Sequence, residues 1–196
     1  MADPFFVDER DPPSKRRILT EALRLFVERG VDGTTVRDIA RASGYTNPAL
    51  FKFFATKDEL ALHLFGRCYA HLHDRAALAC APGRPFDERL GSLLRAFGAI
   101  LDGEPEAFLY VQDNLRIYWP RLPPAERKAS LIELMRALLR DGVAEGRVTA
   151  SVPTDLMVAA ISGTVAQYAR MRHFGELSSE EVDTALKPLI SRMIAV

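Results

Sequence analysis

Apolar residues recur with a helical period along almost the whole chain, and no segment shows the alternating pattern of a half-buried strand. Gly and Pro residues interrupt the pattern at short intervals, and capping-box spacing marks helix starts at Thr56 and Ser178. Helices joined by such short loops indicate an all-α bundle. The nine expected helices cover residues 14–30, 35–43, 47–54, 56–79, 86–101, 105–118, 124–145, 153–172 and 178–195.

Residues 36–53 contain two segments too short to be stable as isolated helices, so they need mutual packing. The small Ala40 permits close approach, Gly44 provides backbone freedom at a sharp turn, and Tyr45 is expected to pack back on the first helix. Asn47 is the expected N-cap of the second helix, and Pro48 fits its first turn. The spacing predicts a helix-turn-helix motif, whose second helix enters the DNA major groove. A plain αα-corner is the alternative.

The charge distribution supports DNA binding, although the formal net charge of the chain is zero. Residues 14–57 carry nine basic and four acidic side chains, a net charge of +5. Residues 1–13 carry −3 and residues 58–196 carry −2. A basic module binds phosphates by releasing counterions. A solvated helix face would carry similar charges, so the motif is needed to make the assignment.

No segment predicts export or membrane insertion. The first ten residues contain no apolar leader, and the run 156–169, which lacks Asp, Glu, Lys and Arg, is only 14 residues long. Cys68 and Cys80 are expected to be buried free thiols. We therefore expect a cytoplasmic protein.

The motif belongs to a longer pattern of apolar, small and charged positions. Its members are Ile18, Leu19, Ala22, Leu25, Phe26, Gly30, Thr34, Thr35, Ile39, Ala40, Gly44, Leu50, Phe51, Phe54, Lys57 and Leu60. This pattern resembles the N-terminal domain of the tetracycline-repressor (TetR/AcrR) family over about residues 14–64. The resemblance implies a homodimer that binds a palindromic operator, usually as a repressor. It also implies release of the DNA by a small hydrophobic or amphipathic effector bound in the C-terminal core.

The resemblance also implies which residues face double-stranded DNA. Thr35 caps the first helix of the motif and meets a phosphate, and Lys57 reaches the backbone from the next helix. Arg16 and Arg17 are placed to touch phosphate or the minor groove. The remaining DNA-facing positions are Thr46, Asn47, Pro48, Ala49, Phe51 and Lys52.

Three residues of the second helix depart from the family pattern. The family usually has Tyr at Phe51, often Gly at Pro48, and often His or Tyr at Phe53. Phe51 therefore lacks the hydroxyl that binds a phosphate in the family. Asn47 could pair with an adenine edge or only cap the helix, and the apolar faces of Pro48, Ala49 and Phe51 could contact thymine methyl groups.

Two helical stripes in the C-terminal part predict a dimer interface, because small and apolar residues permit close helix packing between subunits. Burial within one subunit is the alternative. The stripes are Ala159, Gly163 and Ala166 on one helix, and Val182, Leu186, Leu189, Ile190 and Met193 on the last helix.

The middle helices mix aromatic and polar residues, as a small-molecule pocket requires. Glu59, His63, His71 and His73 do not share one helix face, so we expect no metal site and no cofactor. The candidate pocket residues are Cys68, Tyr69, Phe97, Phe108, Tyr110, Asn114, Tyr118, Trp119, Gln167 and Met171.

The sequence thus predicts an N-terminal arm (1–13), a helix-turn-helix domain (14–57) and a ligand-binding and dimerisation domain (58–196). A DNA-binding regulator without an effector, controlled by a partner protein or by its abundance, is the alternative function. An enzyme on a helical bundle is disfavoured, since the chain lacks the paired Glu-x-x-His motifs of a carboxylate-bridged metal site.

Overall fold

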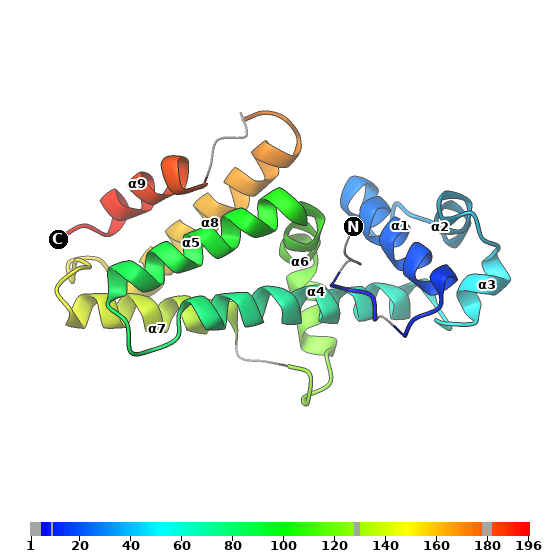
Figure 1. Cartoon of the computed structure of the whole chain (residues 1–196), viewed down its shortest axis with the longest axis horizontal. Coiled ribbons are helices and arrows are strands. Elements are labelled where there is room, and N and C mark those ends of the chain that lie inside the picture. Colours follow the sequence, from blue (N-terminus) through cyan, green and yellow to red (C-terminus); the bar gives the residue numbers. More distant parts are fainter. Residues whose placement is uncertain (1–4, 9, 128–129, 178–181) are drawn as a thin grey trace. The chain divides into compact units, whose positions relative to one another are not determined.

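The computed structural model describes residues 5–8, 10–127, 130–177 and 182–196, with the side chains of residues 183 and 184 left out. These residues form α-helices and one short 3₁₀ helix, η1, and contain no strand, which confirms the all-α prediction (Figure 1). The elements are α1 (Pro13–Arg29), α2 (Val36–Ser43), α3 (Asn47–Phe51), α4 (Lys57–Ala79), α5 (Phe86–Gly103), α6 (Pro105–Tyr118), η1 (Trp119–Arg121), α7 (Leu131–Ala144), α8 (Thr154–His173) and α9 (Val182–Ile194).

The helices fall into two compact units, and each unit combines two segments that are separated in the sequence. The first unit contains the described parts of Met1–His71 and Glu106–Arg127, and the second contains those of Leu72–Pro105 and Lys128–Val196. The first unit is therefore larger than the domain expected at 14–57, because it includes most of α6 and the first part of α4.

The core of the first unit begins at α1, whose apolar face buries Ile18, Leu19 and Phe26. The ring of Phe26 stacks on Tyr110 of α6, with 5.8 Å between centroids. The hydroxyl of Tyr110 donates a 2.9 Å hydrogen bond to the carbonyl of Ala61 in α4. This bond leaves a fully buried hydroxyl satisfied, and it joins α6 to α4 within the unit.

The segment before α1 also packs on α4. The ring of Phe5 stacks on His71 with 3.7 Å between centroids, and Arg67 donates to the Phe5 carbonyl at 3.3 Å. Phe6 and Val7 are buried. The described part of the N-terminal arm is thus held on the first unit.

The second unit packs α5 against α7 and α9, and α8 against α7 and α9. The buried Arg89 of α5 pairs with Asp141 at 2.8 Å and with Glu145 at 3.4 Å. A Cβ atom on Gly142 would lie 2.5 Å from Val148 and 2.7 Å from Phe86, so only glycine allows α7 to come this close to its neighbours.

The observed helices differ from the expected ones mainly at α7. The expected helix began at residue 124, but residues 124–126 form a single turn and α7 begins at Leu131. The hydroxyl of Ser130 accepts a hydrogen bond from the Ile132 N–H at 3.1 Å and so caps the later start. The expected cap at Ser178 and Glu181 lies outside the described residues. Within the described ranges, each helix is too short or too polar to be a candidate membrane span.

Candidate nucleic-acid interface

The helix α2 has only eight residues and is fixed at both ends by local hydrogen bonds. At its start the N–H of Asp38 donates to the Thr35 hydroxyl at 3.2 Å, and the Asp38 carboxylate accepts from the Thr35 N–H at 2.9 Å. This capping box lowers the pKa of Asp38, mainly through the hydrogen bond from the Thr35 hydroxyl. The sequence placed Thr35 at this cap, and the structure shows it there.

The turn between α2 and α3 depends on Gly44, whose φ of 75° lies in the left-handed region. The N–H of Tyr45 donates to the Ala40 carbonyl at 3.0 Å, which completes the end of α2. Thr46, rather than Asn47, occupies the N-cap position of α3, and Asn47 is the first helical residue. The expected N-cap at Asn47 is therefore one residue too late, because Asn47 is already in the helix together with Pro48.

The inner faces of the two helices are buried in the first unit. Ile39 and Leu50 are completely buried, and Ala40 is nearly so. Both helices contact α1. Tyr45 does not follow the expectation, because 38% of it is exposed and it does not belong to this core. The buried face fixes which residues of α2 and α3 point outward.

The outward face combines cations with apolar and polar side chains. Arg37 and Arg41 of α2 are exposed, four residues apart, and are therefore on one helix face. In α3, Asn47 and Ala49 are half-buried. Exposed positions of α3 and its flanks are Thr46, Pro48, Phe51 and Lys52. We use the term outward face for six exposed residues: Arg37, Arg41, Thr46, Pro48, Phe51 and Lys52.

Arg37 and Arg41 belong to the basic segment 14–57, but they were not among the residues expected to face DNA. Their i, i+4 spacing, on the side of the helix opposite the buried Ile39, is the signal that could have identified them. The exposed ring of Tyr45 was also missed, because the turn geometry determines its direction.

Three other basic residues of the expected interface have intramolecular partners. The ammonium of Lys57 donates to the carbonyls of Val31 and Thr34, at 2.5 and 2.8 Å. The Nε of Arg16 donates to the Asp11 carbonyl at 2.9 Å, and Arg17 pairs with Glu21 at 3.3 Å. Lys57 therefore fixes the loop between α1 and α2 in this structure.

Comparisons with known proteins agree with this geometry. The sequence model of the family described as "Bacterial regulatory proteins, tetR family" matches residues 18–64. The transcriptional repressor KstR2 of Mycolicibacterium smegmatis is 28% identical over 89% of this chain and 88% of its own length. The chain belongs to the tetR family. It is thus a transcriptional regulator and not an enzyme.

Solved structures of tetR family proteins share the fold. The ketosteroid transcriptional regulator KstR2 of Mycobacterium tuberculosis superposes with a TM-score of 0.79 at 22% identity, covering 96% of this chain and 97% of that chain. The regulator PfmR of Thermus thermophilus gives a TM-score of 0.69 at 23% identity, with 91% and 97% covered.

The residues expected to line an effector pocket in this tetR regulator are divided between the two units. Seven of them belong to the first unit: Cys68, Tyr69, Phe108, Tyr110, Asn114, Tyr118 and Trp119. All but Trp119 are buried, and the rings of Tyr69 and Trp119 lie 4.4 Å apart. Burial raises the pKa of the Tyr118 hydroxyl to about 12. Six of these seven side chains therefore belong to the buried core of the first unit.

The other three expected pocket residues, Phe97, Gln167 and Met171, belong to the second unit. Phe97 is buried and Met171 is half-buried. Gln167 is exposed on α8, so it does not line an enclosed core, and that expectation is wrong. No group of three or more His, Cys, Asp or Glu residues that could hold a metal ion occurs among the residues described.

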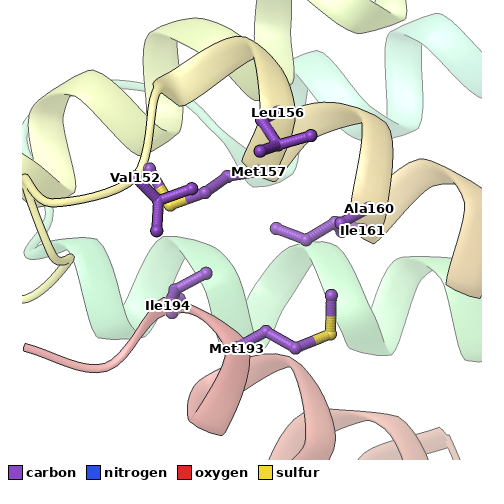
Figure 2. A pocket seen from close by; sticks show the side chains of 7 residues that line it. All are labelled: Val152, Leu156, Met157, Ala160, Ile161, Met193 and Ile194. Carbon is purple, nitrogen blue, oxygen red and sulfur yellow. The ribbon is translucent and has the colours of Figure 1, made fainter.

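The second unit contains a pocket of about 260 Å³ between the first half of α8 and the end of α9. Figure 2 shows apolar side chains from both helices around it, and none of them belongs to the ten expected pocket residues. The lining residues are Val152, Leu156, Met157, Ala160, Ile161, Met193 and Ile194.

The stripes expected at a dimer interface are only partly on the surface. Val182, Leu186 and Ile190 of α9 are buried inside the subunit, so the expectation that they meet a partner is wrong. They follow one another at four-residue spacing on the face of α9 that packs inward. The outward positions are Ala159 and Gly163, both exposed, the half-buried Ala166 and Met193, and Leu189, which is 47% exposed.

Proposed function

We propose that this tetR family regulator is a DNA-binding repressor that binds a palindromic operator as a homodimer and leaves it when a small hydrophobic or amphipathic effector binds. The outward face carries the proposal. Two short helices fixed by a capping box and a left-handed glycine present Arg37, Arg41 and Lys52 beside Pro48 and Phe51. Such a surface attracts phosphates and fits the major groove.

The experiment is selection of binding sequences from a random DNA duplex pool with the full chain, followed by affinity measurements at several salt concentrations. We expect sequence-selective, salt-dependent binding. The double variant Arg37→Ala/Arg41→Ala should bind more weakly, with a salt slope lower by about two units. Arg140→Ala is the matched control, because Arg140 is an exposed arginine of α7 in the second unit. Binding without sequence preference, or equal loss in the control, contradicts the proposal.

The proposed homodimer uses the outward surfaces of α8 and α9. Leu156 is 60% exposed beside the apolar pocket, and the exposed Ala159 and Gly163 permit close approach of another helix. An apolar pocket next to exposed leucine and alanine residues is unfavourable in water and is covered when a second copy packs on it. A twofold dimer contains two helix-turn-helix motifs related by symmetry, and a palindromic site offers one half-site to each of them.

The proposed effector is a small hydrophobic or amphipathic molecule. One solved relative is named a ketosteroid transcriptional regulator, so a test panel should include ketosteroids with other apolar compounds. A compound that binds the folded chain raises its thermal stability and, as an effector, releases it from the selected duplex. A regulator without an effector is the second candidate, and the packed aromatic side chains of the first unit favour it. Release of DNA by no compound in the panel would favour the second candidate.

A further inference from the structure

The outward face contains an apolar surface that protein packing leaves uncovered. Phe51 is 49% exposed, whereas the adjacent Leu50 is completely buried. Pro48 is also exposed and lies three residues before Phe51, so the two residues share one side of α3. A single exposed apolar residue needs no explanation. Two on the same outward side of α3 form a small apolar surface, and a partner that covers this surface gains the free energy of burying it.

Positive charge around this apolar surface indicates the partner. Lys52 follows Phe51 directly, and Arg37 and Arg41 are exposed on α2. No ion pair holds these three cations among the described residues. Cations that flank an apolar surface fit a polyanion that also presents apolar groups. Duplex DNA does so in its major groove, where the C5 methyl of thymine is the apolar group on the base edges.

The chemistry of Phe51 limits what its side chain can bind. Phenylalanine has no hydroxyl, so it donates no hydrogen bond to a phosphate or to a base edge. Against the groove of a duplex, which presents no cation and whose bases are already stacked, its ring gains free energy mainly by covering apolar groups. Pro48 has neither a backbone N–H nor a polar side chain and is limited in the same way.

The geometry points to direct reading of thymine methyl groups by Phe51 and Pro48, so that each operator half-site contains thymine where it meets the outward side of α3. This inference rests on the proposed DNA binding and adds the base that the site selects. Arg37, Arg41 and Lys52 then supply sequence-independent attraction, and the apolar pair supplies part of the preference.

Replacing thymine with deoxyuridine tests the inference, because it removes only the methyl group. In a duplex selected from the random pool, each thymine is replaced singly and then in both half-sites. We expect one or two positions per half-site at which the dissociation constant of the wild-type chain rises about fourfold, the value for one buried methylene-sized group. Symmetric replacement should raise it about 15-fold, since the two effects multiply.

Phe51→Ala should bind thymine and deoxyuridine duplexes equally at the affected position. Ile117→Ala is the matched control, because Ile117 is an exposed apolar residue of α6, 54% exposed, and it should keep the fourfold discrimination. Circular dichroism checks that both variants are folded. Discrimination that persists in Phe51→Ala overturns the role of Phe51.

Selective binding with no deoxyuridine effect at any position overturns the inference and leaves the proposed DNA binding standing. Failure to select any duplex contradicts the proposed function itself. The two failures are therefore distinguishable in one set of measurements.

Discussion

Lys52 and Lys57 are five residues apart in the sequence, yet their ammonium groups have different surroundings. Lys52 is exposed next to α3, whereas Lys57 is half-buried and donates to two backbone carbonyls. The resemblance to the tetR family gave both lysines the same expected role on DNA. The two residues are therefore a natural pair for separating DNA contact from support of the fold.

Lys52→Ala should weaken DNA binding on every duplex sequence and lower the salt slope of log K by about one unit, because one phosphate contact is lost. The free energy of unfolding should stay within about 0.5 kcal/mol of wild type, since the side chain is exposed. Fluorescence anisotropy at four salt concentrations and urea denaturation measure the two quantities. An unchanged salt slope would remove Lys52 from the interface.

Lys57→Ala should instead reduce the free energy of unfolding by about 2 kcal/mol, because hydrogen bonds from a charged donor to the Val31 and Thr34 carbonyls are lost. Urea denaturation measures this loss. The salt slope should change less than in Lys52→Ala. Wild-type stability together with a slope lower by one unit would show that Lys57 leaves the carbonyls to bind phosphate.

At the scale of the element, α2 is the helix most dependent on its ends. It has eight residues, and its start is held by the capping box of Thr35 and Asp38. Short helices gain little from propensity alone, so the cap and the packing of Ile39 must supply the stability. This makes the cap a sensitive point of the candidate interface.

Thr35→Ala should destabilise the protein by about 1 kcal/mol at neutral pH through loss of the N-cap. The pKa of Asp38 is lowered in the folded state, so the contribution of its carboxylate is present above its ordinary pKa and is lost as the pH falls through the folded value. The difference between wild type and Thr35→Ala should therefore shrink below about pH 4. Urea denaturation at several pH values checks this, and a constant difference would contradict the role of the carboxylate.

The sequence was informative where local chemistry decides the structure. Thr35 and Gly44 delimit α2 as expected, because a cap and a left-handed glycine act within a few residues. The sequence was less informative on α9, which carries apolar residues on two sides. Leu186 and Ile190 face the core while Leu189 is exposed, and only the packing of α5 and α8 determines which side is inside.

At the scale of the whole molecule, the expected DNA-facing residues all lie in the first unit, whereas the expected pocket residues are divided between the two units. The interface follows one short motif, whereas the ten pocket residues were chosen by type across several helices. Residue type alone does not predict whether a side chain is packed in the core, as Tyr110 is, or exposed on the surface, as Gln167 is.

Leu156→Arg should abolish dimerisation, because it places a charge beside the apolar pocket on the proposed interface. Affinity for a palindromic duplex should then fall at least tenfold, since a monomer binds through only one helix-turn-helix motif. Analytical ultracentrifugation and anisotropy measure the two effects. Leu78→Arg is the control, because Leu78 of α4 is 77% exposed in the same unit and lies outside the proposed interface. A Leu156→Arg variant that remains dimeric would contradict the proposed interface.

The interleaved composition of the two units bears on how this protein could be engineered. The unit that carries α1, α2 and α3 also contains most of α6, which contributes Tyr110 to the core beneath Phe26. A chimera cut once after the helix-turn-helix motif would leave Phe26 without its stacking partner, because Tyr110 follows the cut in the sequence. Transferring the helix-turn-helix motif to the ligand-binding domain of another protein therefore requires three splice points, after residues 71, 105 and 127, so that α6 is transferred with it.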